Sequence, residues 1–208
     1  MIRYTVKAYT RAELDQDAQP ELYGQPEFIP WGYYDSQNFV TAYGSVSFFA
    51  TTNADSTITN MTQAGAMPAD QYFRPFCFTL DWLIGATIQA SSGAATIADD
   101  LLGIQNTARS IFTFNISNKL YVQVPIHALH SSGGVYVSYQ LGTPTGSGIG
   151  NYAMNWYPDG GYWVNGAFVL SPRNSFTCAI APAAASVTLN ATRMGRVTMW
   201  GPLGRRVL

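Results

Sequence analysis

The sequence has little charge. Only 11% of its 208 residues are Asp, Glu, Lys or Arg, whereas a soluble domain usually has about a quarter. Its formal net charge is −1 and 47% of its residues are hydrophobic. A nearly neutral chain does not bind nucleic acid through its overall charge. A chain this apolar with so few charges would expose much apolar surface as a monomer. We therefore expect that other subunits cover part of that surface.

The residue types that carry catalysis are scarce. The two histidines, His127 and His130, follow a strand-like segment, and no third Cys, His or acid lies near them to complete a metal site. Asp99 and Asp100 are adjacent, so on a helix they point in different directions, and acids at a helix N-terminus explain them better than a catalytic pair. No G-x-S-x-G elbow occurs. We therefore expect no enzyme activity, no cofactor, no metal and no small-molecule substrate.

Cysteine is limited to Cys77 and Cys178, which lie inside apolar, strand-like segments without metal-ligand spacing. We expect both to be buried thiols rather than a disulfide. The first ten residues lack the apolar core of a signal peptide, and no run of about 18 apolar residues occurs. We expect a protein that is made in the cytoplasm and is not exported through a signal peptide.

Aromatic residues are abundant, at 14% of the chain, and they mark the segment 46–82. Two apolar, β-rich runs, 46–50 and 72–83, flank a polar segment of roughly twenty residues. Ile58, Met61, Ala64 and Met67 are spaced three apart in that segment, which predicts one or two helical turns. We interpret the stretch as a strand, an ordered crossover between two sheets, and a second strand.

Short alternating segments run through the rest of the chain, and one short helix is predicted at Ile97–Ile104. Pro30–Tyr34 is predicted to form a turn, and Asn151–Gly166 a long loop packed by its own aromatic residues. The pattern predicts an all-β sandwich or barrel. The strands are predicted at residues 2–9, 38–50, 111–116, 120–126, 133–141, 167–170, 175–180, 186–189 and 196–200, with a hairpin turn at 117–119. The predicted organisation is an N-terminal strand and arm (1–30), a sandwich domain (31–203) and a C-terminal tail (204–208).

Three segments resemble the jelly-roll capsid proteins of tailless icosahedral bacteriophages, the tectivirus, corticovirus and sphaerolipovirus group. The first is the crossover STITNMTQAGAMPADQYFRPFCF, and the second is IFTFNISNKLYVQVPIHAL, two strands joined by a short turn. The third is the pair VLSPRNSFTCAI and VTMWGPLGRRVL. Together they span most of residues 46–208, and none of them contains a catalytic signature.

The resemblance implies a single jelly-roll β-sandwich of two antiparallel sheets, with short helices in its crossovers and extended terminal arms. It implies a non-catalytic subunit that self-assembles into the icosahedral shell of a virion. Its partners would be copies of itself and other capsid proteins. An internal membrane or the packaged genome would lie at the inner face of the shell.

The two ends of the chain differ in charge. The N-terminal segment is acidic, with Glu13, Asp15 and Asp17 among its five acids, and the last 16 residues hold four arginines and no acid. Arginine pairs with both carboxylate and phosphate, but four are few for binding a genome. We predict subunit contacts through these residues, with Arg205 and Arg206 joining capsomers. The arginines concerned are Arg193, Arg196, Arg205 and Arg206.

The aromatic loop YAMNWYPDGGYW at 152–163 carries Trp156 and Trp163. Aromatic residues of this kind pack within a loop or at a subunit contact, and we predict that role for both. They also stack on sugars or bases. The alternative function is therefore a phage spike or a receptor- or carbohydrate-binding β-sandwich module.

Overall fold

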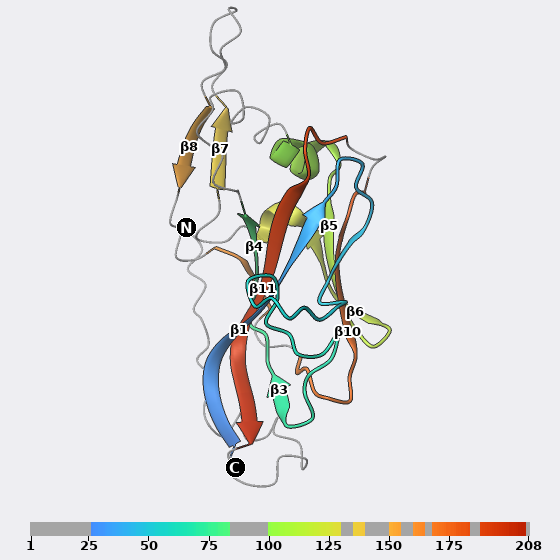
Figure 1. Cartoon of the computed structure of the whole chain (residues 1–208), viewed down its shortest axis with the longest axis vertical. Coiled ribbons are helices and arrows are strands. Elements are labelled where there is room, and N and C mark those ends of the chain that lie inside the picture. The colour runs from blue at the N-terminus through green and yellow to red at the C-terminus, as the bar shows by residue number, and fades with distance from the viewer. Residues whose placement is uncertain are drawn as a thin grey trace, which may run out of the picture.

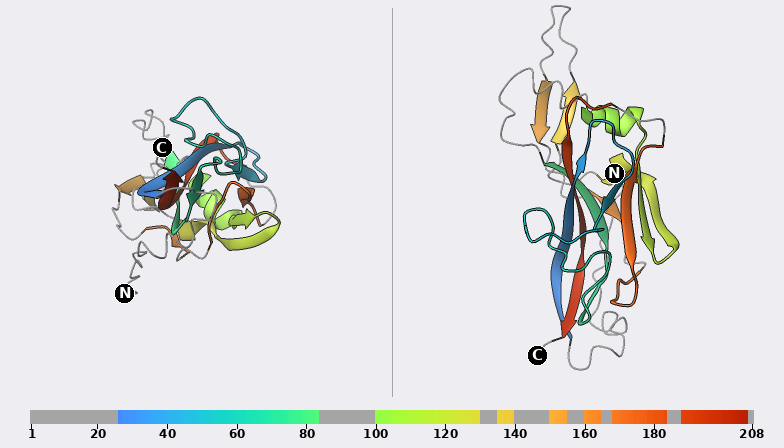
Figure 2. Two further views of the ribbon diagram at one scale, coloured as in Figure 1. Left: turned by 90° about the horizontal axis from the view of Figure 1, so that it is seen from below. Right: turned by 45° about the vertical axis from the view of Figure 1, so that its right-hand side comes forward.

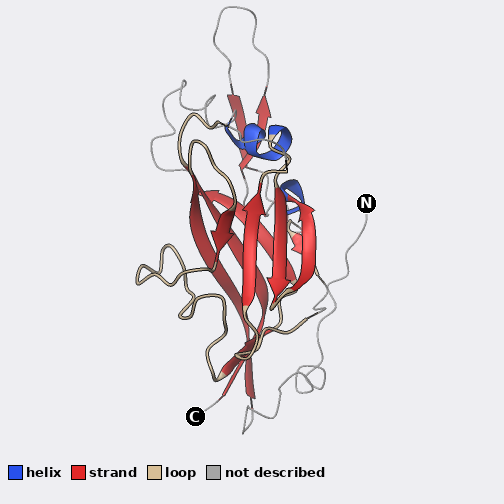
Figure 3. Ribbon diagram, turned by 90° about the vertical axis from the view of Figure 1, so that its right-hand side faces the viewer, coloured by secondary structure: helices blue, strands red, loops and turns tan. Residues whose placement is uncertain are grey.

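The computed structural model describes residues 26–83, 100–129, 135–139, 150–154, 160–164, 168–183 and 188–206. These residues form two antiparallel sheets packed against each other and a separate strand pair, β7 with β8 (Figures 1 and 3). The prediction of an all-β sandwich with two antiparallel sheets is confirmed. The pair consists of β7 (Val135–Tyr139) and β8 (Gly150–Met154).

The first sheet has the strand order β1-β11-β4-β9, and β3 also pairs with β11. Its two long strands, β1 and β11, pair along their whole length, from Pro26 opposite Arg206 to Phe39 opposite Arg193. This ribbon carries the face on which the candidate site lies. The strands are β1 (Pro26–Phe39), β3 (Gln71–Phe73), β4 (Cys77–Leu83), β9 (Tyr162–Trp163) and β11 (Arg193–Arg206).

The second sheet has the strand order β2-β10-β5-β6. In β5 the buried residues are every second one, as the alternating sequence predicts for a strand with one face on the core. The predicted β5–β6 hairpin is confirmed, with its turn at Ser117 and Asn118. The strands are β2 (Val46–Phe48), β5 (Ile111–Ile116), β6 (Lys119–Pro125) and β10 (Phe176–Ala181).

Aromatic side chains from both sheets form the core. The ring of Phe78 on β4 lies 5.4 Å from that of Phe112 and 5.0 Å from that of Phe114, both on β5. Phe176 on β10 extends the cluster, 5.8 Å from Phe114. Edge and offset contacts between such rings stabilise a core by about 0.5–1.5 kcal/mol per pair beyond the burial of area. Many of the aromatic residues noted in the sequence thus fill the space between the two sheets.

The segment between β2 and β3 is an ordered crossover from the second sheet to the first, as predicted. Its predicted helical turns are wrong, because residues 49–70 form bends, turns and one isolated bridge. The backbone instead pairs with β1: the Ser36 N–H donates to the Ile58 carbonyl at 2.9 Å, and Asp35 bridges to Thr59. Met61 and Met67 are nevertheless buried. Their spacing reflected contact with the core and not a helix.

Several predicted boundaries differ from the structure. The predicted turn Pro30–Tyr34 lies inside β1, and the predicted loop 151–166 includes all of β8 except Gly150 and all of β9. The predicted strand 72–83 is broken between β3 and β4 where the chain passes over β11: a Cβ on Gly201 would lie 2.1 Å from the Arg74 carbonyl oxygen. In the predicted strands 167–170 and 186–189, the described residues contribute isolated bridges at Leu170 and Thr188. Residues 167, 186 and 187 and the whole predicted strand 2–9 lie outside the described residues.

The predicted ends of the sandwich also differ. β1 begins at Pro26, inside the segment predicted as an arm, and β11 continues through Arg206, inside the predicted tail. Both extensions have the same cause, because these ends pair with each other and do not leave the sheet.

Helical structure in the described residues is short. Asp100–Leu102 forms a helical turn that continues into a π-helical turn, η1 (Gly103–Thr107), so the described part of the helix predicted at 97–104 is helical. Residues 97–99 lie outside the described residues. A 3-10 turn, η2 (Ile126–Leu129), follows β6 and carries His127. Cys77 and Cys178 are buried free thiols, as predicted. No helix among the described residues is long and apolar enough to cross a membrane.

Candidate functional site

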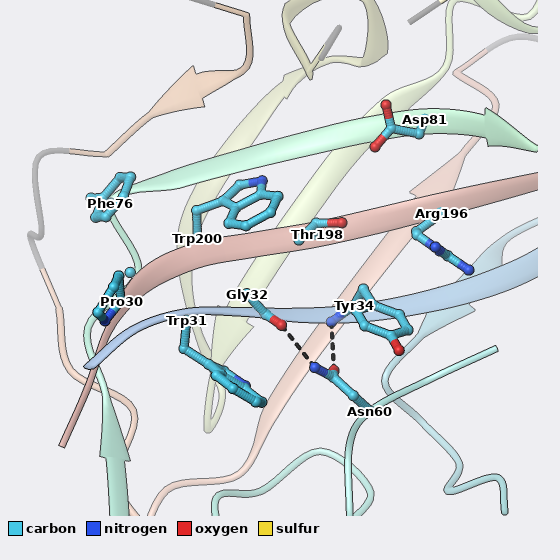
Figure 4. A pocket seen from close by; sticks show the side chains of 11 residues that line it. Pro30, Trp31, Gly32, Tyr34, Asn60, Phe76, Asp81, Arg196, Thr198 and Trp200 are labelled. Atoms are coloured by element: carbon cyan, nitrogen blue, oxygen red, sulfur yellow. Dashed lines mark hydrogen bonds between the residues drawn. The ribbon is translucent and has the colours of Figure 1, made fainter. Parts of the chain in front are cut away.

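A groove of about 500 Å³ lies on the outer face of the first sheet, across β1, β11 and β4 (Figure 4). Successive residues of a strand point to opposite faces. On β4, Phe78, Leu80 and Trp82 belong to the core, and the alternate residues Thr79 and Asp81 therefore face outward with the groove. Its volume is in the range of about 300–1,000 Å³ that ligand pockets occupy.

Trp200 provides the broadest exposed surface of the groove, with 44% of the residue accessible. Its ring lies over Gly32 on the neighbouring strand, where a Cβ would approach the ring to 2.8 Å. The indole Nε1–H donates to the Thr79 hydroxyl at 3.1 Å. The indole therefore spans from β1 to β4 and is fixed at both ends.

Arg196 lies farther along β11, and its guanidinium is 4.7 Å from the centre of the Tyr34 ring, a cation–π geometry. Its Nε donates to the Ser36 hydroxyl at 2.9 Å, and one terminal nitrogen donates to the carbonyl of Thr57 in the crossover. These contacts fix the guanidinium against β1.

Asn60 closes the edge of β1 beside the groove. Its Oδ1 accepts a hydrogen bond from the Tyr34 N–H, and its Nδ2 donates to the Gly32 carbonyl, each at 2.8 Å (Figure 4). The side-chain amide thus makes the two bonds that a neighbouring strand would make. Because these polar groups are held before any partner arrives, the groove is preformed, with Trp31 exposed at its rim.

Two buried carboxylates lie elsewhere in the described residues. Asp35, on β1, accepts hydrogen bonds from the Phe49 N–H at 2.6 Å and from Gln37 Nε2 at 2.9 Å. Burial raises its pKa, and these hydrogen bonds oppose that shift. The geometry is that of a clamp that holds Phe49, whose φ of 59° is costly for a residue other than glycine.

Asp100 is the other buried carboxylate, and its role differs from the prediction. It accepts bonds from the Asn190 N–H at 2.6 Å and from Arg193 Nε at 2.6 Å. The carboxylate therefore ties the helical turn to the start of β11 across 93 residues. Favourable placement at a helix N-terminus is not its main interaction.

The predicted contact arginines do not form one cluster. Arg193 pairs with Asp100, and Arg196 stacks on Tyr34. Arg205, near the end of β11, forms an exposed ion pair with Glu27 at 2.8 Å. Arg206 ends β11 opposite Pro26. Each of the first three is held within its own chain, because β11 places it beside residues of β1, of the crossover or of the helical turn.

The other predicted contact residues are placed only in part. Trp163 on β9 stacks on Phe76, with ring centres 5.4 Å apart and planes at 8°. The role of Trp163 in a subunit contact stays a prediction. Glu13, Asp15, Asp17 and Trp156 lie outside the described residues.

Sequence reasoning missed the groove. Trp200 was predicted in a strand, but neither Trp31, Tyr34 nor Asn60 was singled out. Alternation along β1 was a usable signal for Tyr34, and it was hidden by the prediction of a turn at Pro30. Asn60 carried no local signal, because its partners are 26 and 28 residues away.

The described residues contain no group of three or more His, Cys, Asp or Glu side chains placed to hold a metal ion. His127 is exposed on η2, and its predicted neighbour His130 lies outside the described residues. Comparison with protein-family models, with curated proteins and with solved structures finds no match to this chain.

Proposed function

We propose that the protein is a non-catalytic capsid subunit built as a single jelly roll, which assembles into the shell of a virion. The observation that carries this proposal is the nested pairing of its strands. In the eight strands of the two main paths, the first pairs with the last, β1 with β11, and the innermost two, β5 and β6, pair with each other. Between them, β2 pairs with β10 and β4 with β9.

Nested pairing is the order obtained when one long hairpin folds over into two sheets. Two further strand pairings, β11 with β4 and β10 with β5, then complete two sheets of four strands. Eight strands arranged as two Greek keys in a double sheet define the jelly roll, an architecture common in viral capsid domains. The short β3 pairs with the end of β11 and lies off this path. The topology therefore supports the resemblance seen in the sequence.

The surface supports assembly. Charge is scarce over the chain, and aromatic residues and an arginine line the preformed groove. Trp, Tyr and Arg are the residues that dominate binding energy in protein interfaces, in pockets that exclude water. The partners we propose are copies of the chain and other capsid proteins, with a membrane or genome beneath the shell. The Glu27–Arg205 pair, exposed at the end of the ribbon, is a further point of contact in this proposal.

Sizing of the purified full chain tests the proposal. Sedimentation velocity over a range of concentrations is expected to show capsomers or larger regular assemblies. A single species with the mass of a monomer at every concentration would contradict the proposal.

The groove also favours a second candidate, a receptor- or carbohydrate-binding module. Exposed indoles beside fixed polar groups suit the apolar and hydroxyl faces of a sugar. A glycan array probed with the wild type and with Trp200→Ala distinguishes the two. Binding that requires Trp200, in a protein that does not assemble, supports the second candidate. The absence of binding in an assembling protein supports the first.

A further inference from the structure

The carboxyl group of Asp35 is buried on the inner face of β1, with 1% of the residue exposed. Its Oδ2 accepts two hydrogen bonds, from the Phe49 N–H and from Gln37 Nε2. Its Oδ1 is buried as well and has no hydrogen-bond partner among the described residues. A buried, ionised carboxylate with an unpartnered oxygen is costly. The arrangement therefore favours the protonated, neutral carboxyl group.

The described side chains that face Asp35 from the neighbouring elements are neutral. Val197 lies opposite it on β11, and Thr59 bridges to it from the crossover. Burial, and next the charge of Asp35, raise the pKa of the Cys178 thiol on β10 well above its ordinary value, so this thiol is uncharged. Arg196 is next to Val197 but projects from the outer face, where it lines the groove. No described cation therefore offsets an ionised Asp35.

The hydrogen bond from Phe49 to Asp35 is the first of a series that holds the crossover. The Phe49 carbonyl accepts from the Gly65 N–H, and the Gly65 carbonyl accepts from the Phe176 N–H on β10, each at 2.7 Å. Phe49 and Gly65 both have a left-handed φ, of 59° and 57°. Such a backbone at a residue other than glycine persists only while its surroundings hold it. Asp35 therefore helps to fix the crossover between the two sheets.

The same crossover forms one side of the groove. Asn60 makes its two hydrogen bonds to β1 from there, and the Thr57 carbonyl accepts a hydrogen bond from Arg196. The right-hand view of Figure 2 shows the crossover, in teal, on the side of β1 and away from the β5–β6 hairpin. Asp35 lies on the opposite face of the same stretch of β1. Movement of the crossover away from β1 would therefore open that side of the groove.

We propose that Asp35 is a pH-sensitive switch, which holds the crossover closed against β1 while its carboxyl group is protonated and releases it when that group ionises. The protonated Oδ1 is a donor, and the hydroxyl of Thr59 is its acceptor. Ionisation removes this donor and leaves a buried charge that needs water. Water enters as the crossover moves, and Asn60 and Thr57 then leave the groove. The switch belongs to the folded subunit and does not depend on assembly.

The direction of the switch follows from the burial of Asp35. Burial raises the pKa of its carboxyl above the ordinary value of 3.8, and hydrogen bonds, first among them that from Gln37, oppose the shift. The closed form therefore keeps its proton at pH values where the open form, with a hydrated carboxyl, has lost it. This preference for the closed form is fully present below about pH 3.8 and is lost as the pH rises through the raised pKa.

Hydrogen exchange of the full chain at pH 4 and pH 7, resolved to single residues and divided by the intrinsic rate at each pH, tests the switch. The amides of Tyr34 and Ser36 donate to the crossover. Those of Tyr33 and Gln37 alternate with them and point to β11, so they report unfolding of the sheet itself. We expect several-fold more opening at Tyr34 and Ser36 at pH 7 than at pH 4, without a matching change at Tyr33 and Gln37.

Two variants assign the effect. Asp35→Asn resembles the protonated carboxyl, because an amide has one acceptor oxygen and a donor nitrogen. We expect it to keep the opening at its pH 4 level at both pH values. Asp55→Asn is the matched control, since Asp55 is an exposed acid of the same crossover. Hydrogen bonds from Thr57 lower the pKa of Asp55, so it is ionised at both pH values and its replacement should leave the wild-type pH dependence.

Equal opening of the wild type at pH 4 and pH 7, a result that needs no variant, overturns the switch. A pH dependence that Asp35→Asn retains, or that Asp55→Asn removes, overturns it as well. Each of these results leaves the proposed capsid function standing. A chain that opens on ionisation of Asp35 and never assembles supports the switch and overturns that function alone.

Discussion

Arg193 and Asp100 form a buried ion pair, with 2.5 Å between Arg193 Nη2 and Asp100 Oδ2, although the two residues are 93 positions apart. Only 1% of the Asp100 side chain is exposed, and its oxygens also accept the backbone N–H groups of Asn190 and Ala191. Removing one member of a buried pair leaves an uncompensated charge, which costs about 3–5 kcal/mol. We expect Asp100→Ala to lower the free energy of unfolding by about that amount in urea titrations.

The exposed pair Glu27–Arg205 is the matched control for this prediction. Its side chains are 43% and 48% exposed, and exposed pairs contribute about 0–1 kcal/mol. Glu27→Ala should therefore change the free energy of unfolding little. Equal losses from Asp100→Ala and Glu27→Ala would contradict the assignment of Asp100 as the tie between the helical turn and β11.

The carboxyl of Asp35 is predicted to make the free energy of unfolding depend on pH. Burial raises the pKa of its carboxyl above the ordinary value of 3.8, so the folded state favours the protonated form. Between the ordinary pKa and the raised one, the folded state holds more protons than the unfolded state. The contribution of Asp35 is therefore fully present below about pH 3.8 and is lost as the pH rises through the raised pKa.

Asp35→Asn removes this titration and leaves an oxygen to accept the Phe49 N–H. We expect the stability of the variant relative to wild type to improve from pH 4 to pH 7, as measured by urea unfolding at both values. Asp35→Ala, which also removes the hydrogen bonds, should lose about 1–3 kcal/mol at either pH. A difference between wild type and Asp35→Asn that does not change with pH would show that the carboxyl titrates normally.

Gly32 is predicted to be required for the groove. A Cβ at this position would lie 2.8 Å from the Trp200 ring, so the indole must shift when any side chain is added. We expect Gly32→Ala to cost about 1–3 kcal/mol and to change the fluorescence of Trp200. Gly44→Ala is the control, because nothing lies within 4 Å of its added Cβ. If both variants have the wild-type emission spectrum and stability, the indole is not seated over Gly32.

Cys77 and Cys178 are predicted to react only after unfolding. Burial raises the pKa of Cys77 to about 12 and raises that of Cys178 well above its ordinary value. Since the thiolate is the reactive form, neither should react with a thiol reagent in the native protein at pH 8. Titration in denaturant without reductant should find two thiols. Rapid reaction of the native protein would contradict the burial, and no thiols in denaturant would indicate a disulfide.

The local parts of the fold were predictable from sequence. The β5–β6 hairpin alternates over adjacent residues, and its turn lies between the two strands, so both signals are contained in one short segment. The crossover was predictable for the same reason, because its length and the regular spacing of its apolar residues can be read from the sequence. Two of those residues, Met61 and Met67, are buried in the structure. Its conformation was not, because the hydrogen bonds that shape it go to β1.

Prolines concealed the long ribbon. Pro30 and Pro202 pair with each other in β1 and β11, and proline ordinarily argues against a central strand. Pro30 is on an edge strand, and Pro202 lies in the gap between the segments of β11 that pair with β4 and with β3. Neither position therefore needs the missing N–H. Because the ribbon was missed, so were the Trp200 platform and the contacts of Arg196.

Electron microscopy of the purified full-length protein, under the conditions where it sediments as its largest species, tests the central claim most directly. We expect capsomers or shells of regular size, built from many copies of the two-sheet sandwich. Isolated single sandwiches under all conditions of concentration and salt would contradict it.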